Sequence, residues 1–385
     1  MIYSLFYFKN KNQYLKFQNA EYAYLYYANS RLNLLSNTIE AIGVTEFIRE
    51  VEEMKVSTTF SKPWVCHLYY EFSHLIELKN IDKTAPLVLV VKYQDVKTCA
   101  PKKAKSIALG KAKQATFARY EKAFAQIQNH LKAGDCYQVN LTTNATYEFP
   151  KEIRAQDFTN LFLSSSPAAY AHLTYIPSLE RMYFSNSPEC LFGIKNETLF
   201  SLPIKGSAKL ESEKDFSKTW KTLSSSQKEQ AELFMISDLI RNDLNRIALP
   251  TAKVVQKKRP LRVPDILHQY SKIAVKVNKS TSMWKIVSSL FPGGSITGAP
   301  KKRVLEILKK VEWSARGFYC GSTLLFFGEQ KQASINIRSA TIDFQKNILT
   351  YGSGGGVTLL SECENEFDEM LLKQKSFTSF LSKNS

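Results

Sequence analysis

The fold class is decided by residues 318–351, which read FYCGSTLLFFGEQKQASINIRSATIDFQKNILTY. Three segments of this stretch, 318–327, 333–344 and 348–351, are rich in β-branched and aromatic residues and are predicted to be strands. Short polar connections at 328–331 and 345–347 join them. Such connections imply antiparallel pairing, because a parallel return needs a crossover of a dozen or more residues. The C-terminal part is therefore predicted to be an antiparallel meander.

Helices are predicted upstream of this meander. Apolar residues recur at steps of three and four along 117–131, the period of an amphipathic helix; they are Phe117, Tyr120, Phe124, Ile127 and Leu131. Gly134 is suited to end this helix, and a strand is predicted at 136–142. Further helices are predicted at 226–247 and 300–311, with Pro300 in the first turn, where a missing N–H does no harm. Helices together with antiparallel strands predict an α+β fold.

Two zones are predicted along the 385 residues. Residues 1–100 are rich in Tyr, Phe, Leu and Val, carry strand-like segments such as 87–91, and contain no group of reactive side chains. They are predicted to be a divergent, β-rich region that packs on the same fold as the later residues. Residues 115–380 carry the candidate functional motifs and are predicted to form the catalytic region. The stretch between the zones is typical of a linker and is rich in lysine, with Lys102, Lys103, Lys105, Lys111 and Lys113.

The sequence excludes several classes of protein. The longest aliphatic run, 86–91, is far below the roughly 20 residues that a membrane span needs. Residues 1–8 lack the basic start and the small-residue cleavage site of a signal peptide. The six cysteines form no Cys-x-x-Cys pair, so neither a metal–thiolate site nor a disulfide framework is indicated. A cytoplasmic protein without a membrane partner is expected.

The formal net charge is +17, from 52 Lys and Arg against 35 Asp and Glu. A charge of this size can attract nucleic acid. Here the basic residues are spread along the chain and do not form a patch with stacking aromatics. This distribution favours an ordinary lysine-rich surface, and no nucleic-acid partner is predicted. A positive field of this kind can also steer a small anionic substrate.

Two pairs of glutamates are candidate metal ligands, Glu229 with Glu232 and Glu366 with Glu369. Residues three apart share a helix face, so each pair can direct both carboxylates to one place. Four carboxylates that converge from two helices repel one another unless a hard cation lies between them. Mg²⁺ prefers such oxygen ligands and keeps positions open for water or an anion. The alternative is that each pair belongs to an ordinary solvated helix face.

Two glycine-containing stretches are candidate anion sites. Gly354, Gly355 and Gly356 allow backbone N–H groups to approach an anion without a Cβ in the way. The stretch 292–300 leads into a predicted helix, whose N-terminus also favours anions. Arg338 lies among apolar neighbours, which indicates a buried guanidinium that needs a carboxylate from the protein or from a substrate. Ordinary turns and a structural salt bridge are the alternatives, and neither a Walker nor a dinucleotide-binding motif is present.

An ordered set of motifs carries a resemblance to a known family. The set consists of Ser187-Pro188-Glu189, Pro203-Ile204-Lys205-Gly206-Ser207, Lys228-Glu229-Gln230-Ala231-Glu232, Asp238-Leu239-Ile240-Arg241-Asn242-Asp243-Leu244, residues 292–301, Arg316-Gly317-Phe318-Tyr319-Cys320-Gly321, Ile337-Arg338 and Gly354-Gly355-Gly356. Over roughly residues 115–375 the chain resembles the chorismate-utilising enzymes, which include anthranilate synthase component I, aminodeoxychorismate synthase component I, isochorismate synthase and salicylate synthase. The lysine at position 205 is similar to the aminodeoxychorismate synthases, since the other members usually carry alanine there.

The resemblance implies a fold and a reaction. The fold is a sandwich of antiparallel sheets with helices on the outer faces, in α/β/β/α layers. The reaction is the Mg²⁺-dependent amination of chorismate at C4 to 4-amino-4-deoxychorismate, on the route to p-aminobenzoate and folate. No glutaminase cysteine motif is found in the chain, so ammonia is expected from a separate glutamine amidotransferase subunit. Anthranilate synthase and isochorismate synthase are the alternatives, and Lys205 argues against both.

The resemblance also implies roles for individual residues. Lys205 would attack ring carbon C2 and form a covalent adduct, which ammonia then displaces by adding at C4. Attack requires surroundings that favour the neutral amine, since a lysine is normally protonated at neutral pH. Glu189 would protonate the departing 4-hydroxyl, and His268 would act in hydrogen bonding or acid–base chemistry. The other implied roles are Mg²⁺ ligation by Glu229, Glu232, Glu366 and Glu369, and substrate binding by Ser207, Ser295, Tyr319, Arg338, Gly354, Gly355 and Gly356.

The chain departs from the family pattern at several positions. Ser207 replaces the usual threonine but keeps the hydroxyl group. Gln269-Tyr270 replaces the more familiar Leu-Val, and Leu359-Leu360 stands where Ala-Asp is usual. None of these changes removes a residue to which the resemblance gives a role in the reaction.

Overall fold

The computed structural model describes residues 1–210, 212–248, 251–263 and 266–382. Its strands are β1 Tyr3–Phe8, β2 Gln13–Tyr26, β3 Arg31–Asn33, β4 Thr38–Glu40, β5 Phe60–Leu68, β6 Val88–Cys99, β7 Gln138–Glu148, β8 His172–Ile176, β9 Arg181–Ser185, β10 Cys190–Lys195, β11 Thr198–Leu202, β12 Ile204–Lys209, β13 Lys253–Val263, β14 Ile266–Lys276, β15 Gly298–Ala299, β16 Ser322–Gly328, β17 Gln330–Ile335, β18 Ser339–Asp343 and β19 Ile348–Val357. Its helices are α1 Val44–Glu53, α2 Phe117–Lys132, α3 Ala155–Ser164, α4 Phe216–Ser225, α5 Gln227–Asn245, α6 Met283–Leu290, α7 Lys301–Val311 and α8 Cys363–Ser382, with short helical turns η1 to η5 between them. No helix in these ranges is long and apolar enough to cross a membrane.

Every strand pairing within these ranges is antiparallel. The helices predicted at 117–131, 226–247 and 300–311 are confirmed as α2, α5 and α7. Gly134 follows α2 with a φ of +76°, a left-handed conformation that suits glycine after a helix. The predicted α+β class is therefore confirmed.

The predicted meander of residues 318–351 is interrupted in the middle. β16 pairs with β17, and β18 pairs with β19, as expected. The prediction of one strand at 333–344 is wrong, because β17 ends at Ile335 and β18 begins at Ser339. Arg338 lies in the break with a φ of +52°, outside the range of strand residues. β17 also pairs with β10, whereas β18 pairs with β9. The chain therefore moves from one part of the sheet to another at this break.

Two further boundaries differ from the prediction. β19 continues through the glycine run to Val357, and Gly354, Gly355 and Gly356 pair with residues 142, 141 and 140 of β7. Glycine is rare in strands, which is why the sequence pattern stopped at residue 351. The lysine-rich stretch is not a free linker either, because Ile107 is buried and the Gly110 N–H donates to the backbone oxygen of Glu148 at 2.8 Å.

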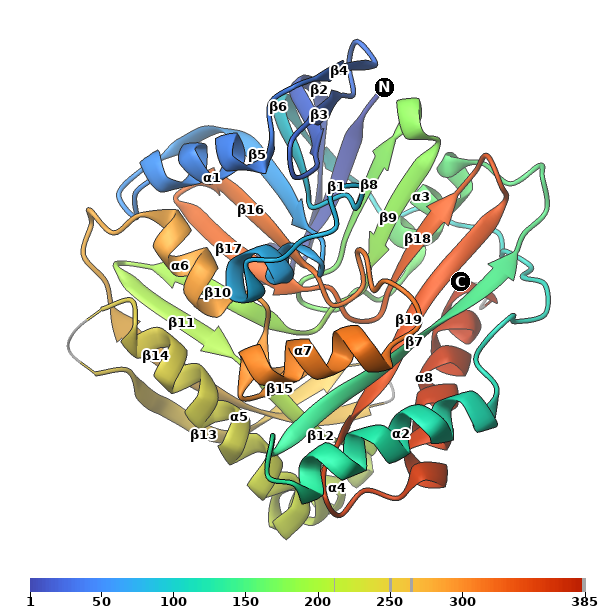
Figure 1. The fold of residues 1–385 in the computed structure, drawn as a ribbon. Helices are drawn as coiled ribbons and strands as arrows, with labels where there is room; N and C mark the ends of the chain where they lie inside the picture. The colour runs from blue at the N-terminus through green and yellow to red at the C-terminus, as the bar shows by residue number, and fades with distance from the viewer. Residues whose placement is uncertain (211, 249–250, 264–265, 383–385) are drawn as a thin grey trace.

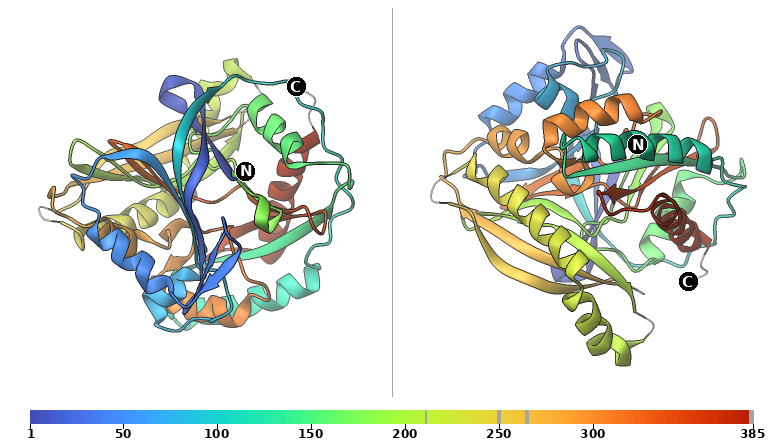
Figure 2. Two further views of the ribbon diagram at one scale, coloured as in Figure 1. Left: turned by 90° about the horizontal axis from the view of Figure 1, so that it is seen from above. Right: turned by 60° about the horizontal axis from the view of Figure 1, so that its bottom comes forward.

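The pairings form one sheet that is folded over on itself. One half has the order β15–β7–β19–β18–β9–β8–β1–β2. The other half has the order β6–β5–β16–β17–β10–β11–β14, and β14 also pairs with β12 and β13. The long strands β2 and β6 pair with each other where the halves join, and in the left view of Figure 2 they run through the middle of the molecule. Strands from residues 1–100 are thus paired directly with strands of the later region.

The alternation of side chains along these strands creates inner and outer layers. On β6, Val88 and Val90 pack in the cluster beneath α1, α5 and α6, whereas Leu89 and Val91 pack in the cluster between the two halves. Successive strand residues face opposite sides, so one strand serves both layers. Helices α2, α3, α7 and α8 cover the opposite outer face, as Figure 1 shows. This α/β/β/α arrangement confirms the predicted sandwich.

The two ends of the folded sheet meet at one place. β12 lies at the end of one half, and β7 and β19 lie at the end of the other. They approach each other at Gly356, where an added methyl group would lie 2.3 Å from Gln138 Nε2 and 3.3 Å from Lys205 Nζ. Only glycine leaves room for both side chains at this position. The fold therefore brings Lys205 against the glycine run.

A buried arginine fixes the segments around this meeting point. The Arg316 guanidinium donates to both carboxylate oxygens of Glu312 at 2.8 Å, and to the backbone oxygens of Ile296 and Asn140 at 2.7 and 2.6 Å. A bidentate pair of this kind is strong and directional. Arg316 also precedes Gly317 and Tyr319, so one side chain holds β7, the 292–300 stretch and the Tyr319 segment together.

Candidate active site

Lys205 lies at a β-bulge on β12. In the pairing with β14, Lys205 is opposite Gln269 and Ser207 is opposite His268, so Gly206 is the extra residue. Gly206 has a φ of +84°, which favours glycine. Bulges redirect neighbouring side chains, and this one places the lysine and the serine beside different residues of the same partner strand.

The Lys205 side chain is nearly enclosed. It is 15% exposed, and its Nζ lies 4.0 Å from Glu232 Oε2 on α5. This separation allows attraction but not a hydrogen bond. No hydrogen bond from Nζ is formed to the described residues in this conformation, so its donors remain available to a bound molecule or to a small rearrangement of the side chains.

Glu189 is a buried carboxyl group whose pKa is affected by Lys205. Its side chain is 3% exposed, and burial raises its pKa to about 7, although the Ser295 hydroxyl and the Lys205 charge act in the opposite direction. Glu189 Oε1 and Ser295 Oγ each lack a hydrogen-bond partner of good geometry among the described residues. A carboxyl group with a pKa near neutrality can hold and release a proton at physiological pH. This environment fits the predicted general acid.

His268 connects Arg338 with Ser207. The guanidinium carries only donors, so Arg338 Nη2 donates to His268 Nε2 at 3.0 Å. Nδ1 therefore carries the proton and faces Ser207 Oγ at 2.8 Å and the Gly206 backbone oxygen at 3.3 Å. Burial and the Arg338 charge lower the pKa of His268 to about 4. In this arrangement the neutral imidazole orients the two neighbouring side chains.

Arg338 and Tyr319 form a candidate site for a carboxylate. Within the described parts of the chain, no Asp or Glu lies at ion-pair distance from Arg338, and burial lowers the pKa of its guanidinium. Tyr319 packs on Gly352, where an added methyl group would lie 2.1 Å from the ring. The Tyr351 phenol lies near both side chains and acts to raise the pKa of each. A buried guanidinium without a protein carboxylate favours an anionic ligand.

The four predicted metal ligands lie on two helices. They are Glu229 and Glu232 on α5, and Glu366 and Glu369 on α8. Each pair is separated by one helical turn, as expected. Glu369 Oε1 forms an ion pair with Lys373 Nζ at 2.7 Å. Glu232 Oε2 lies 4.0 Å from Lys205 Nζ. Lysine ammonium groups therefore compensate part of this negative charge.

The four carboxylates fit Mg²⁺ in their chemistry but are not gathered around one point. A methyl group on Gly355 would lie 2.8 Å from Glu366 Oε2, and one on Gly356 would lie 3.3 Å from Lys205 Nζ. Adjacent strand residues face opposite sides, so Glu366 and Lys205 approach β19 from opposite sides. Among the described residues, no three His, Cys, Asp or Glu side chains lie close enough to hold an ion. Carboxylate oxygens are nevertheless the ligands that Mg²⁺ prefers.

Three residues to which the sequence analysis gave no role also lie at the site. Gln138 and Gln269 are both 0% exposed and border Lys205. Lys373 Nζ donates to the backbone oxygen of Gly354 at 2.8 Å. A glutamine or a lysine in a helix or strand has no distinctive sequence pattern, so only the pairing of distant strands identifies these residues.

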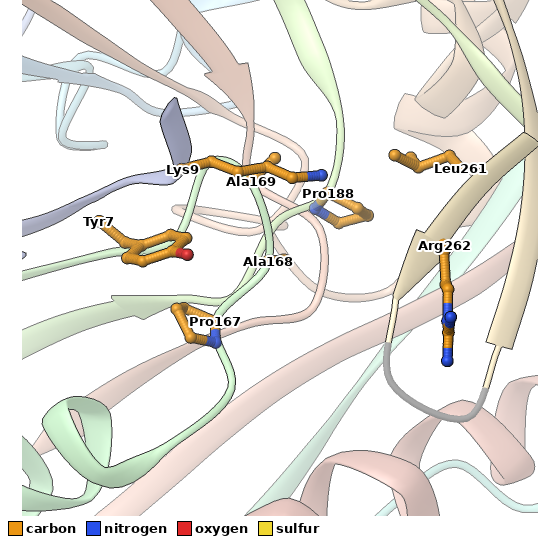
Figure 3. Close-up of a pocket in the computed structure, with 8 residues that line it drawn as sticks. All are labelled: Tyr7, Lys9, Pro167, Ala168, Ala169, Pro188, Leu261 and Arg262. Carbon is orange, nitrogen blue, oxygen red and sulfur yellow. The ribbon is translucent and has the colours of Figure 1, made fainter. Parts of the chain in front are cut away.

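A surface groove lies next to the backbone segments that contain Glu189 and Lys205. It is lined by Pro188 and Ile204, each of which directly precedes one of these residues, and by two cationic side chains, Lys9 and Arg262. In Figure 3, Lys9 extends toward Pro188 from one wall, and Leu261 and Arg262 lie on the other. None of the predicted site residues lines this groove.

Residues 45–379 match the sequence model of the chorismate binding enzymes. Among individual relatives, the chain is 34% identical over 272 residues to aminodeoxychorismate synthase component 1 of Escherichia coli strain K12. It is 32% identical over 279 residues to "anthranilate synthase component 1 3" of Haloarcula marismortui. These alignments cover 69% and 70% of this chain but only 58% and 54% of the two relatives.

The fold also matches solved structures. The crystal structure of anthranilate synthase component I from Streptococcus pneumoniae aligns with a TM-score of 0.79 and covers 94% of this chain and 91% of its own. The identity is 18%. At this level the similarity supports the same fold, which agrees with the folded-over antiparallel sheet.

Proposed function

We propose, because this chain belongs to the family of chorismate-binding enzymes, that it converts chorismate and ammonia to 4-amino-4-deoxychorismate and water. The observation that carries this proposal is the nearly enclosed Lys205 Nζ at the meeting point of the sheet ends, with Glu232 Oε2 at 4.0 Å and the buried Glu189 beside it. An amine and a carboxylic acid at one site suit nucleophilic displacement of a hydroxyl group. Product analysis with chorismate and an ammonium salt is the direct test.

The proposed reaction has two displacement steps. In the first, the Lys205 amine bonds to ring carbon C2, the ring double bonds shift, and the C4–O bond breaks. Glu189 gives its proton to the departing hydroxyl, which leaves as water, and the new alkylammonium returns one proton to the Glu189 carboxylate. In the second step, ammonia bonds to C4, the double bonds shift back, and the C2–N bond to Lys205 breaks. One proton of the new C4 ammonium passes to the departing nitrogen, so Lys205 is released as an amine. The sum is chorismate plus ammonia to aminodeoxychorismate plus water.

The other side chains would orient the substrate. Arg338 and Tyr319 suit the enolpyruvyl carboxylate, because the guanidinium is buried without a protein carboxylate among the described residues. His268 holds Arg338 through Nε2 and Ser207 through Nδ1, and the glycine strand allows the substrate to lie close to the backbone. The alternative of anthranilate formation is disfavoured, since a nucleophilic lysine at C2 occupies the ring position that would be aminated.

Glu229, Glu232, Glu366 and Glu369 would hold Mg²⁺ in the presence of chorismate, and their carboxylates would have to move together for this, since the described side chains are not gathered around one point. The bound cation would neutralise the ring carboxylate and fix the ring relative to Lys205. We expect Glu366→Gln to raise the Mg²⁺ concentration for half-maximal activity by about tenfold or more, equivalent to about 1.4 kcal/mol. Titration of Mg²⁺ in the amination assay, with direct metal binding by calorimetry, measures this.

The matched control for this prediction is Glu364→Gln. Glu364 lies on the first turn of the same helix and is exposed, so its loss is expected to leave the Mg²⁺ requirement unchanged. An identical shift in both variants would indicate a general electrostatic effect. If Glu366→Gln leaves the Mg²⁺ concentration for half-maximal activity unchanged, Glu366 is not a metal ligand.

A separate glutamine amidotransferase subunit is the proposed source of ammonia. The relative from E. coli is named a component 1, which fits a chain that acts with a second component. We expect glutamine to support turnover when a glutaminase subunit of this type is added, at a lower nitrogen concentration than ammonium salts require. If glutamine and the subunit together give no gain over ammonium salts, this assignment is wrong.

A further inference from the structure

Two buried glutamines beside Lys205 contain polar atoms without partners. Gln138 on β7 and Gln269 on β14 are both 0% exposed. Among the described residues, neither amide atom of Gln138 has a hydrogen-bond partner, and Gln269 Oε1 lacks one as well. Burying a polar atom without a partner costs roughly 1–3 kcal/mol. These atoms therefore indicate a partner that becomes available in another state of the site.

Both carboxamides border the Lys205 side chain. Gln269 is the cross-strand partner of Lys205 at the bulge, and a methyl group on the adjacent Gly206 would lie 2.9 Å from Gln269 Nε2. Gln138 reaches the lysine from the other half of the sheet, since a methyl group on Gly356 would lie 2.3 Å from its Nε2 and 3.3 Å from Lys205 Nζ. The lysine donors and the glutamine acceptors are thus adjacent and unmatched.

We propose that Gln138 and Gln269 are positioning residues whose Oε1 atoms accept two N–H groups of the Lys205 side-chain amine. A neutral primary amine has two N–H donors and one lone pair. When both donors are held, the direction of the lone pair is fixed, and here it is aimed at ring carbon C2 of the substrate. The inference rests on the proposed function to the extent that Lys205 is the nucleophile.

The geometry allows each glutamine to play this part. Gln269 Nε2 donates to the Glu229 backbone oxygen at 3.1 Å, which anchors the amide and leaves Oε1 available. A half-turn of the Gln138 amide exchanges Oε1 and Nε2 without moving any other atom, and this places the oxygen on the side of Lys205. A carboxamide accepts these hydrogen bonds without adding charge to a site that already holds Glu189 and Glu232.

The kinetic test uses Gln138→Leu and Gln269→Leu, which keep similar side-chain shapes and remove the acceptors. With chorismate, Mg²⁺ and an ammonium salt, kcat is expected to fall roughly 10- to 100-fold in each variant, because a misdirected nucleophile reacts slowly. KM for chorismate is expected to stay within about twofold, since neither amide binds the substrate in this scheme. Unchanged kcat in both variants would contradict the inference.

Gln374→Leu is the matched control. Gln374 is 2% exposed and its Oε1 also lacks a partner among the described residues, but it lies on α8 and bonds to Ser353 Oγ at 2.8 Å. It is expected to keep the kcat of the unmodified protein. A loss of kcat equal to that of the other two variants would mean that any buried glutamine is needed for packing, and would overturn the specific role.

A measurement without substrate separates this inference from the proposed function. Acetic anhydride at fixed pH modifies lysines, and peptide mass spectrometry gives the rate at Lys205 relative to the exposed Lys209 on the same strand. The relative rate at Lys205 is expected to fall several-fold in Gln138→Leu and Gln269→Leu but not in Gln374→Leu. This result would support the positioning role even if the protein did not aminate chorismate. Equal relative rates in all three variants would contradict it.

Discussion

Lys205→Ala is expected to abolish the amination of chorismate while leaving the protein folded. The covalent route requires an amine at C2, and alanine supplies none, so kcat is expected to fall by about 10³-fold or more, which corresponds to about 4 kcal/mol of activation free energy. The side chain is 15% exposed and forms no hydrogen bond within the described structure, so its removal costs little folding free energy. Product analysis by chromatography and thermal unfolding measure the two effects.

Lys209→Ala provides the control for this substitution. Lys209 is an exposed residue of the same strand, β12, and its truncation removes an equal charge without reaching the site. Activity close to that of the unmodified protein is expected. Rapid quenching with chorismate, followed by mass spectrometry, should also find the adduct on Lys205. If Lys205→Ala retained full amination, a covalent mechanism would be excluded.

Glu189→Gln is expected to show the second largest loss of activity. The amide has nearly the same shape as the acid but has no acidic proton for the 4-hydroxyl, and loss of a general acid costs roughly 10²- to 10⁴-fold in rate. In the unmodified protein, the pKa of about 7 predicts that kcat declines as the pH rises above 7, because the acid loses its proton. A rate that does not depend on pH around 7 would exclude this role.

The same residue should make stability depend on pH. Burial raises the pKa of Glu189 from its usual 4.5 to about 7, so the folded protein prefers the protonated form. The resulting stabilisation is fully present below the unfolded pKa and is lost as the pH rises through about 7, with a magnitude of roughly 3 kcal/mol. Glu189→Gln removes this loss, so at about pH 8.5 it should unfold at higher denaturant concentration than the unmodified protein, while at about pH 4.5 the two should be similar.

Local patterns in the sequence predicted the helices and the class of the fold well. The three-and-four spacing of apolar residues located α2 because a helix buries one stripe. The break at Arg338 could not be predicted, because the apolar residues on both sides continue the strand pattern. The strand breaks because β17, before Arg338, pairs with β10, whereas β18, after it, pairs with β9. The strand through Gly354, Gly355 and Gly356 was missed because pairing with β7 overrides the low propensity of glycine.

The chemical residues of the site were predictable where their types are distinctive. An ordered set of lysine, glutamate, histidine and arginine motifs predicted Lys205, Glu189, His268 and Arg338 as site residues. In the structure Arg338 donates to His268 at 3.0 Å, and the Lys205 charge acts to lower the pKa of Glu189. Gln138 and Gln269 were not predictable as neighbours of Lys205. Their proximity follows from strand pairings and from the meeting of the two sheet ends, which no local pattern encodes.

The most direct test of the proposed reaction is product analysis of the purified protein with chorismate, Mg²⁺ and an ammonium salt, compared with Lys205→Ala. We expect an aminated product that retains its enolpyruvyl group, becomes p-aminobenzoate when a lyase is added, and is lost in the variant. Anthranilate or isochorismate as the product of the unmodified protein would contradict the proposed chemistry at C4, and turnover that does not depend on Lys205 would contradict the proposed nucleophile.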